Sequence, residues 1–329
     1  MNKQVLEIDG GKNEKLEKER AKIDVYQSLY ASFKTLNKSK KTTLAVKVIG
    51  LKNNLNISND KPEVKICAVC ELGDSGWQII VPAGYMGFAK SEFPDNMTPM
   101  DKVSKYRAYI KKMVGATIDV VIVAIDLKSM VAAGNRELAM KDKIKRNYFT
   151  YDKNGLSKIE RAFKNGKPAQ ARVVTIAKSV VILDVFGYIT PVIARNVEWR
   201  FIENLKDVLS VGDIVPVKIM TLELDKDNEE ILECYVSIKD AKENMMKRNM
   251  ARFTENSSYA GKVTGINNGY YVQIGDFENG IDVLCKIVHS YENPNLGDTV
   301  LVTIGIKDEA IGKVYGRIDE ILSKNSRVA

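Results

Sequence analysis

The feature that most constrains the fold of this chain is a strand pattern that occurs three times. Each copy is an apolar strand that opens with Gly, and an Asp-containing end follows 22 to 28 residues later. The glycines are Gly115, Gly212 and Gly297, and the ends are Lys141-Asp142, Lys239-Asp240 and Arg317-Ile318-Asp319. Because the copies are about 85 to 97 residues apart, close to the length of one small β-barrel, the sequence predicts three barrels in series.

Charge is concentrated in one part of the chain. The 329 residues carry a formal net charge of +8, and 45% of them are hydrophobic, which is ordinary for a globular protein with two or three domains. Residues 141–178 hold eleven Lys or Arg against three Asp or Glu, an excess as large as that of the whole chain. This local basicity favours an acidic partner such as a nucleic acid.

Cysteine usage and hydropathy predict a cytoplasmic protein. Four cysteines and no apolar signal segment at the start are typical of a reducing compartment, and no stretch approaches the length of a membrane span. Cys67 and Cys70 lie in an alternating apolar run, where residues three apart point to opposite faces of a strand. We therefore expect buried, inert thiols, with no metal and no cofactor.

Changes in hydrophobic period divide the chain into segments. Spacings of three and four residues indicate helix near the start, period two indicates strands from residue 43 onward, and Gly-Lys-Pro at 166–168 marks an entry to a strand. The predicted segments are a charged helical arm (1–42), a first, elaborated barrel (43–142), a basic connector (143–168), a second, degenerate barrel (169–240), a linker helix (241–256), a third barrel (257–322) and a tail (323–329).

The helical arm carries an apolar stripe that something has to cover. Its members fall at helical spacing and are Tyr26, Leu29, Tyr30, Phe33 and Leu36. One interpretation is that the stripe packs on the first barrel. The other is that Tyr26, Leu29, Tyr30 and Phe33 form a surface for self-association or for a partner protein.

Several short strings resemble one family of barrels. They are Gly261-Lys262-Val263, Gly269 to Ile274, Gly297 to Val300, Gly87 to Glu92 and Val236 to Asp240. Together they resemble the S1 RNA-binding domain, the oligonucleotide-binding (OB) fold module that is repeated in ribosomal protein S1. The resemblance covers about residues 43 to 321. It implies a mainly β protein of three five-stranded OB-fold barrels in tandem, with an N-terminal helix and short connecting helices.

The resemblance also implies binding residues in the third repeat. The family binds single-stranded RNA through exposed rings on the second and third strands, a His on the third strand and a basic residue near the last. Strand parity places Val272 and Ile274 inward and leaves Tyr271 outward as the stacking platform. Lys286 stands where the family has its His, and Lys313 falls near the basic position.

The first repeat and the basic connector add further candidates. Lys90 occupies the His position of the first repeat, and Arg136 lies within one residue of its closing Arg. Trp77 shares the parity of Ile79 and Val81, so we expect it in the core. The connector would contribute cations to a nucleic-acid track, namely Lys143, Lys145 and Arg146.

The second repeat departs most from the family. It places Val180 or Ile182 at the platform, Ile193 near the His position and Glu233 at the Arg position. Because none of these side chains suits a nucleic acid, we expect this face to bind none.

Catalytic signatures are weak in this sequence. The single His, His289, has no Ser or Cys partner that the sequence places beside it, and no Gly-rich phosphate loop precedes a helix. The sequence therefore predicts a protein that is not an enzyme.

Two functions remain open at this point. The first is binding of single-stranded RNA or another nucleic acid. The second is a structural or assembly role, for example in a virion, because residues 257–320 hold nine acidic residues against five basic ones and the second repeat lacks contact residues. Abundant Lys, Asn and Ile are also typical of an AT-rich bacterial or bacteriophage genome.

Overall fold

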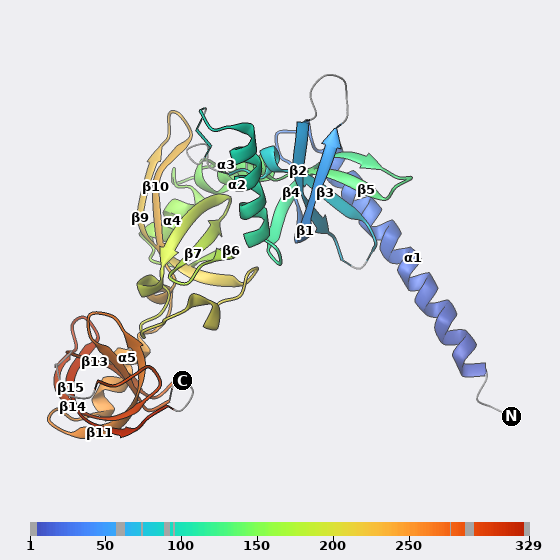
Figure 1. Cartoon of the computed structure of the whole chain (residues 1–329). Helices are drawn as coiled ribbons and strands as arrows, with labels where there is room; N and C mark the ends of the chain where they lie inside the picture. The colour runs from blue at the N-terminus through green and yellow to red at the C-terminus, as the bar shows by residue number, and fades with distance from the viewer. Residues whose placement is uncertain are drawn as a thin grey trace.

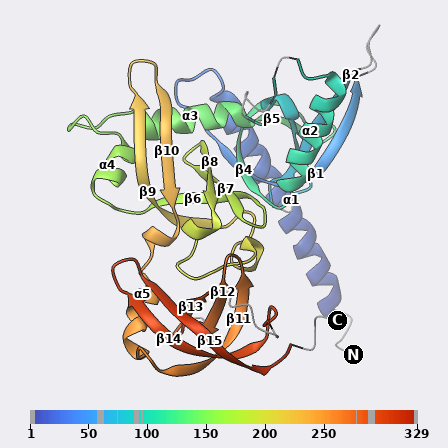
Figure 2. The ribbon, with the colours of Figure 1, turned by 60° about the vertical axis from the view of Figure 1, so that its left-hand side comes forward.

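Three β units and one projecting helix make up the molecule. The structure is a computed structural model that describes residues 5–56, 63–73, 75–88, 93–94, 96–276, 278–286 and 293–325. The first two units lie side by side, the third is set apart beyond a narrow connection, and α1 extends away from the first unit (Figures 1 and 2). No helix in these ranges combines the length and the apolar character needed to cross a membrane.

Each unit is built from five strands. The first contains β1 (Leu44–Asn56), β2 (Glu63–Glu71), β3 (Gln78–Pro82), β4 (Thr117–Asp126) and β5 (Val131–Asn135). The second contains β6 (Ala169–Ile176), β7 (Val180–Val185), β8 (Tyr188–Ile193), β9 (Ile214–Asp225) and β10 (Glu230–Ser237). The third contains β11 (Ser258–Ile266), β12 (Tyr270–Ile274), β13 (Ile281–Cys285), β14 (Thr299–Asp308) and β15 (Lys313–Ser323).

Helices are few and mostly short. The α-helices are α1 (Val5–Lys34), α2 (Pro99–Lys112), α3 (Arg136–Tyr148), α4 (Lys158–Lys164) and α5 (Met245–Asn249). The 3₁₀ turns are η1 (Ala83–Tyr85), η3 (Ala194–Asn196), η4 (Leu205–Asp207), η5 (Lys239–Ala241) and η6 (Met250–Arg252).

The three units share one strand order. The first and third close into barrels, β1-β2-β3-β5-β4 and β11-β12-β13-β15-β14, and the second runs β10-β9-β6-β7-β8. In the second unit β8 and β10 form no ladder, although the N–H of Ile238 donates to the Asn196 carbonyl at 2.9 Å near their ends. The prediction of a mainly β protein with three five-stranded OB-fold units is confirmed.

The repeated glycine occupies the same structural position in every unit. Gly115, Gly212 and Gly297 adopt φ of 91°, 96° and 89°, a backbone region that glycine enters without steric cost. Each N–H donates at 2.8 Å to a carbonyl of the first strand in its own unit, from Val48, Val173 and Val263 respectively. A β-bulge follows directly after each of these acceptors. The sequence repeat is therefore a repeated backbone junction.

The ends of the repeats, by contrast, are not equivalent. Asp142 lies inside α3, Asp240 lies in η5 after the last strand of the second unit, and Asp319 lies within β15. The sequence expectation of a common closing position is thus wrong, because the last strand is followed by a helix in the first unit and by a 3₁₀ turn in the second.

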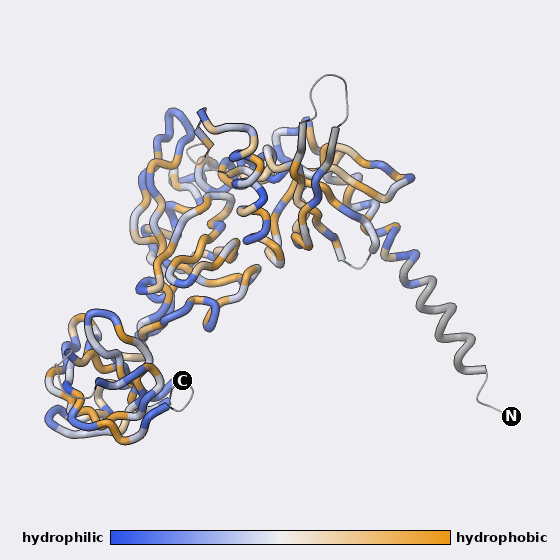
Figure 3. The backbone as a smooth tube through the Cα atoms, in the orientation of Figure 1, coloured by the Kyte–Doolittle hydropathy of each residue, from blue (hydrophilic) through white to orange (hydrophobic). Residues whose placement is uncertain are grey.

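Each unit has its own hydrophobic core. Figure 3 shows hydrophobic residues as orange stretches along the chain in all three units. Trp77 is 4% exposed and belongs to the first core, as its parity predicted. The first core also receives side chains from the second unit, namely Val174, Ile182, Ile189 and Val211. The first two units therefore share a continuous apolar interface.

The arm helix α1 anchors itself on the first barrel through its last turns. Leu29 is fully buried in the first core, and Tyr26 stacks on Trp77 with ring centroids 6.2 Å apart. The buried Ser32 hydroxyl accepts from the Ile122 N–H and donates to the Thr42 carbonyl. Leu29 is therefore unavailable as a partner residue, which corrects that interpretation.

Part of the predicted stripe remains accessible. The side chains of Tyr30 and Phe33 are 41% and 39% exposed, and Tyr26 is half-buried. Of the four predicted partner residues, Tyr30 and Phe33 therefore remain the most accessible.

Candidate nucleic-acid interface

The outer face of the third barrel begins with β12. Tyr270, Val272 and Ile274 are buried, whereas Tyr271 is half-buried and points outward. The parity argument from sequence is confirmed, because alternate residues of a strand point to opposite faces of the sheet.

Cross-strand register extends this position into a row. Tyr271 pairs with Leu284 of β13, and Leu284 pairs in parallel register with Tyr315 of β15. Leu284 and Tyr315 are also half-buried. A hollow of about 270 Å³ adjoins the row at Tyr315 and is lined in addition by Ile306 and Arg317.

Three exposed cations flank the row of Tyr271, Leu284 and Tyr315. Lys286 and Arg317 come one residue after the paired Cys285 and Gly316, and Lys313 opens β15 one residue before Val314. Tyr271, Lys286 and Lys313, all predicted from sequence, thus belong to one face. Arg317 has a carboxylate neighbour, because its Nε lies 2.8 Å from Asp319 Oδ1.

The Tyr271 ring, which the sequence predicts to be an open stacking surface, is covered by another ring. Phe201, from the segment after β8, stacks on Tyr271 with ring centroids 4.0 Å apart and planes inclined by 18°. The Phe201 ring also lies against Gly265 of β11, where any Cβ would overlap it. The sequence interpretation of Tyr271 as an open platform is therefore corrected: the ring points outward, and another part of the chain occupies its stacking position.

A buried ion pair holds this cover in place. Arg200 Nε lies 3.2 Å from Asp282 Oδ1, and both side chains are less than 10% exposed. The Phe201 N–H donates to the second oxygen of Asp282 at 2.6 Å, and Arg200 also donates to the Asp276 carbonyl at 2.9 Å. Burial raises the pKa of Asp282, while the charge of Arg200 opposes the rise. Sequence reasoning missed this segment, whose signal is an Arg between two aromatic residues in a loop.

The corresponding face of the second unit is closed by the first. Ile182 of β7 and Ile189 of β8 pack against the first core. Asp184, between them in the same sheet, is buried and accepts from the Gly187 N–H at 2.6 Å. This packing supplies a physical reason for the expectation that the second repeat binds no nucleic acid by this face.

Arg136 is not positioned to contact a nucleic acid. It is 3% exposed at the start of α3, and it donates to the Met86 carbonyl at 2.5 Å. Burial lowers the pKa of its guanidinium, an effect that the nearby Asp184 and Asp119 oppose. Its predicted role is corrected because the first and second units close around it.

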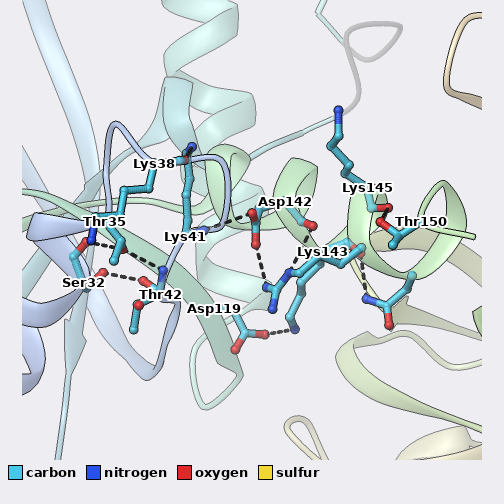
Figure 4. Close-up of polar contacts among 12 residues, drawn as sticks. Ser32, Thr35, Lys38, Lys41, Thr42, Asp119, Asp142, Lys143, Lys145 and Thr150 are labelled. Atoms are coloured by element: carbon cyan, nitrogen blue, oxygen red, sulfur yellow. Dashed lines mark hydrogen bonds and ion pairs between the residues drawn. The ribbon is translucent and has the colours of Figure 1, made fainter.

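The predicted connector cations are engaged with carboxylates, and Figure 4 shows the pairing of Lys143 with Asp119. Lys143 pairs with Asp119, which also accepts from Arg172 at 2.9 Å. Arg146 pairs with Asp142 at 2.6 Å, one turn before it on α3. Lys145 lies 3.3 Å from the exposed Glu229. Lys143 therefore joins α3 to β4, and Arg146 is neutralised within α3. Neither belongs to a free basic track, and Lys145 is the most exposed of the three.

Other cations of residues 141–178 remain exposed. Lys141, Arg161 and Lys178 form ion pairs with Glu137, Asp152 and Glu203. Exposed cations without an ion pair to any carboxylate that the structure describes are Lys153, Lys158, Lys164 and Lys167. These four lie on and around α4, far along the chain from the third barrel.

Two further chemistries that the sequence raises are a reactive thiol and a metal site. Cys67 and Cys70 are both buried, and burial raises the pKa of Cys70 to about 12, which keeps its thiol protonated. Among the residues with described positions, no three His, Cys, Asp or Glu side chains gather to hold a metal ion. Lys90 and His289 lie outside the described residues.

Comparisons with known proteins give a limited result. No protein-family model matches the chain, and no curated protein matches it. The chain is similar to the crystal structure of a multidomain protein with nucleic acid binding domains from Streptococcus pneumoniae, at 14% identity and a TM-score of 0.18, over 86% of this chain and 75% of that one. It is also similar to the Ifi202 HINa domain in complex with a 20-base-pair double-stranded DNA, at 12% identity and a TM-score of 0.18, over 86% and 96% of the two chains. At such TM-scores neither likeness carries an argument about function.

Proposed function

We propose that the chain is a non-catalytic, cytoplasmic protein that binds single-stranded RNA or another single-stranded nucleic acid through S1-like OB barrels. The outer face of the third barrel would be its binding face. Tyr315 would stack a base, Lys286, Lys313 and Arg317 would neutralise phosphates, and Tyr271 would accept a second base when Phe201 moves aside.

One observation carries this proposal. Tyr271, Leu284 and Tyr315 form a continuous outward row across three strands, and cations stand on both sides of it. Single-stranded nucleic acids are bound by this combination, in which bases stack on rings while cations follow the backbone. Stacking contributes about 1 to 3 kcal/mol per base, which suffices for a weak platform even on an acidic barrel.

Affinity measurements with the full chain test the proposal. We expect a fluorescein-labelled, mixed-sequence single-stranded RNA to bind more weakly as salt rises, because binding releases counterions. Tyr315→Ala should weaken binding about tenfold, corresponding to the loss of one stacked base. Tyr151→Ala, which removes a 40% exposed ring from the segment between α3 and α4, serves as the matched control and should change little.

The cover on Tyr271 provides a second arm of the test. Phe201→Ala should tighten binding about fivefold by exposing Tyr271, and adding Tyr271→Ala should abolish that gain. Absence of any salt-dependent binding by the wild-type chain would overturn the proposal. Equal losses for the Tyr315 and Tyr151 variants would remove the third barrel as the binding face.

A second function is favoured by the way the barrel faces are used. The second unit meets the first through Ile182, and the third barrel receives Phe201, so both faces contact protein. An assembly protein, for example a virion component, would extend this use of OB faces to other chains.

Size-exclusion chromatography with light scattering distinguishes this alternative. A defined oligomer that dissociates in the Tyr30→Asp, Phe33→Asp variant would support assembly, because these are the rings that α1 leaves accessible. A monomer that retains salt-dependent RNA binding would exclude assembly through α1.

A further inference from the structure

The hollow of about 270 Å³ beside Tyr315 opens at a β-bulge between β14 and β15. The register passes from the pair Ile304 and Gly316 to the pair Ile306 and Tyr315, so Gly305 is the extra residue of the bulge. Gly305 is exposed and lines the hollow. Because it carries no side chain, the space beside Tyr315 stays open.

Neither packing nor backbone conformation requires glycine at position 305. Among the described atoms within 4 Å, a Cβ added there would meet one, the Tyr315 carbonyl oxygen at 3.5 Å, which is ordinary contact. The φ of Gly305 also lies outside the left-handed region that favours glycine. A Cβ at Gly316, by contrast, would overlap the Thr303 carbonyl oxygen. Packing therefore explains Gly316, whereas close approach of a ligand to the backbone gives Gly305 a reason.

Two largely apolar side chains wall the hollow. Tyr315 is half-buried, and its ring, unlike that of Tyr271, stacks on no other ring in the part of the chain that the structure describes. Ile306, its partner in the register, is 65% exposed, although burial of an Ile side chain is favourable. The volume lies just below the range of about 300 to 1,000 Å³ typical of drug-sized ligands. The hollow therefore suits one flat ring system.

Asn256 lines the hollow from the segment before β11. Its N–H donates to the Ile304 carbonyl at 2.8 Å, and the Ile304 N–H donates to the Ser257 carbonyl at 3.1 Å, so its backbone is fixed against β14. Its φ is 59°, in the left-handed region that Asn enters more readily than most residues. Among the described residues its carboxamide has no hydrogen-bond partner. A donor and an acceptor on one planar group are therefore available at the hollow.

The other polar side chains of the lining, apart from the Tyr315 hydroxyl, are engaged with protein. Asp319 accepts from the Thr303 hydroxyl and from Arg317 Nε, the latter at 2.8 Å. The Thr303 hydroxyl also lies 2.7 Å from that of Ser258. The Arg317 side chain is 75% exposed, so the rest of its guanidinium faces solvent. Asn256 is therefore the lining residue best placed to hydrogen-bond a ligand.

These features fit a nucleobase, and among the bases they fit adenine best. Bases stack through their flat faces and hydrogen-bond through their edges, and in a single strand these edges are accessible. An Asn carboxamide pairs with adenine through two hydrogen bonds, because it donates to a ring nitrogen and accepts from the amino group. Guanine is typically paired with Arg, but the Nε of Arg317 is bonded to Asp319.

We propose that this hollow is an adenine pocket, in which the base stacks on Tyr315 and its amino group and neighbouring ring nitrogen are hydrogen-bonded to Asn256. Ile306 and the backbone of Gly305 would enclose the ring. The inference rests on the proposed function, because it assigns a base preference to the same face of the third barrel. The proposed function itself requires no preference among the bases, so the two can be tested separately.

Affinities of the full chain for fluorescein-labelled single-stranded RNAs test the pocket. The strands have about 12 nucleotides, a length within the site size of OB folds. They are oligoadenylate, oligouridylate, oligocytidylate and oligouridylate with interspersed guanosines, all measured at one salt concentration. A strand of purine ribonucleoside keeps the purine ring and lacks the amino group, so it separates hydrogen bonding from stacking. We expect oligoadenylate to bind about tenfold more tightly than each other strand, the discrimination that one bidentate base contact gives.

Two variants should abolish the preference for oligoadenylate over oligouridylate. Asn256→Gly removes the carboxamide and keeps a residue that adopts positive φ without strain. Gly305→Val fills the hollow from an unstrained position. The matched control is Asn268→Gly, which removes the same side chain from a residue with φ of 51° in the same barrel and should retain the preference. The readout is the ratio of two affinities, which a partial loss of folded protein leaves unchanged.

The other outcomes count against the pocket. Equal affinity for all strands, with salt-dependent binding retained, would overturn the pocket and leave the proposed function intact. Equal binding of the adenylate and purine ribonucleoside strands would assign the preference to stacking alone. A preference for guanosine would make Arg317 the reading residue, and a preference that survives Asn256→Gly would exclude Asn256. Absence of binding to every strand would overturn the proposed function and the pocket together.

Discussion

The second and third units present the same face of the same fold, but different structures cover it. Ile182 and Ile189 of the second unit meet an entire hydrophobic core across an apolar interface. The third face is covered by Arg200 and Phe201 from one short segment, through one buried ion pair and one ring stack. Strand order gives each unit a potential binding face. The segments packed against that face decide whether a ligand can reach it.

The two covers also differ in what their removal would cost. Separating the first two units exposes a large apolar area, at about 25 cal/mol per Å². Moving Phe201 off Tyr271 breaks one ring stack, which a group stacking on Tyr271 in its place would restore. Aromatic pairs contribute about 0.5 to 1.5 kcal/mol beyond area burial. The second face is therefore permanently structural, whereas under the proposed function the third would exchange its cover for a base.

The largest predicted effect concerns the interface between the first two units. Ile182→Asp should lower the free energy of unfolding by about 4 kcal/mol, because it places an unpaired charge among apolar side chains. Chemical denaturation followed by circular dichroism measures the change. Ile214→Asp is the matched control, since Ile214 is 64% exposed in the same sheet, and its cost should stay within about 0.5 kcal/mol. Similar losses of unfolding free energy in both variants would mean that the first unit does not cover this face of the second unit.

The next effect concerns the ion pair between Arg200 and Asp282, which holds the Phe201 segment on the third unit. Arg200→Met should cost about 3 kcal/mol, because it leaves the buried Asp282 carboxylate without its partner. Adding Asp282→Asn should recover part of the loss, since no uncompensated charge then remains. Arg248→Met is the control for an exposed pair with Glu243 and should cost less than about 1 kcal/mol. If adding Asp282→Asn recovers no stability, the loss in Arg200→Met does not come from an unpaired Asp282 charge.

The smallest of the three effects concerns the space that Phe201 occupies. Gly265→Ala should cost about 2 kcal/mol and expel the Phe201 ring, because a Cβ there would overlap it. Hydrogen exchange at the Phe201 N–H, which donates to Asp282, should accelerate. Gly305→Ala in the same barrel meets only ordinary contact with the Tyr315 carbonyl and should leave this exchange unchanged. Unchanged protection in the Gly265 variant would place Phe201 elsewhere in solution.

Local rules predicted the parts of the site that depend on one strand at a time. Alternation placed Tyr271 outward and Trp77 inward, and both orientations are observed. The repeated glycine could be predicted as a structural position because the hydrogen bond of its N–H joins two residues of one unit. Neither rule contains information about what lies across an interface.

Partners distant in the chain account for the corrections. Arg136 was predicted as a binding residue from its place in the repeat, but it is buried where two units meet. Lys143 was predicted as a free cation, but Asp119, 24 residues away, neutralises it. The charge of a side chain is fixed by its type, whereas its availability depends on which carboxylates the fold brings within reach.

The amino-acid sequence by itself determined three five-stranded units, because hydrophobic alternation and a glycine with positive φ act over short distances along each strand. Only the tertiary structure decided which faces remain open, since Phe201 reaches Tyr271 from a different unit, 70 residues earlier in the chain. The physical reason is that burial and charge pairing are set by groups that approach through space, and the local pattern around either residue does not encode that approach.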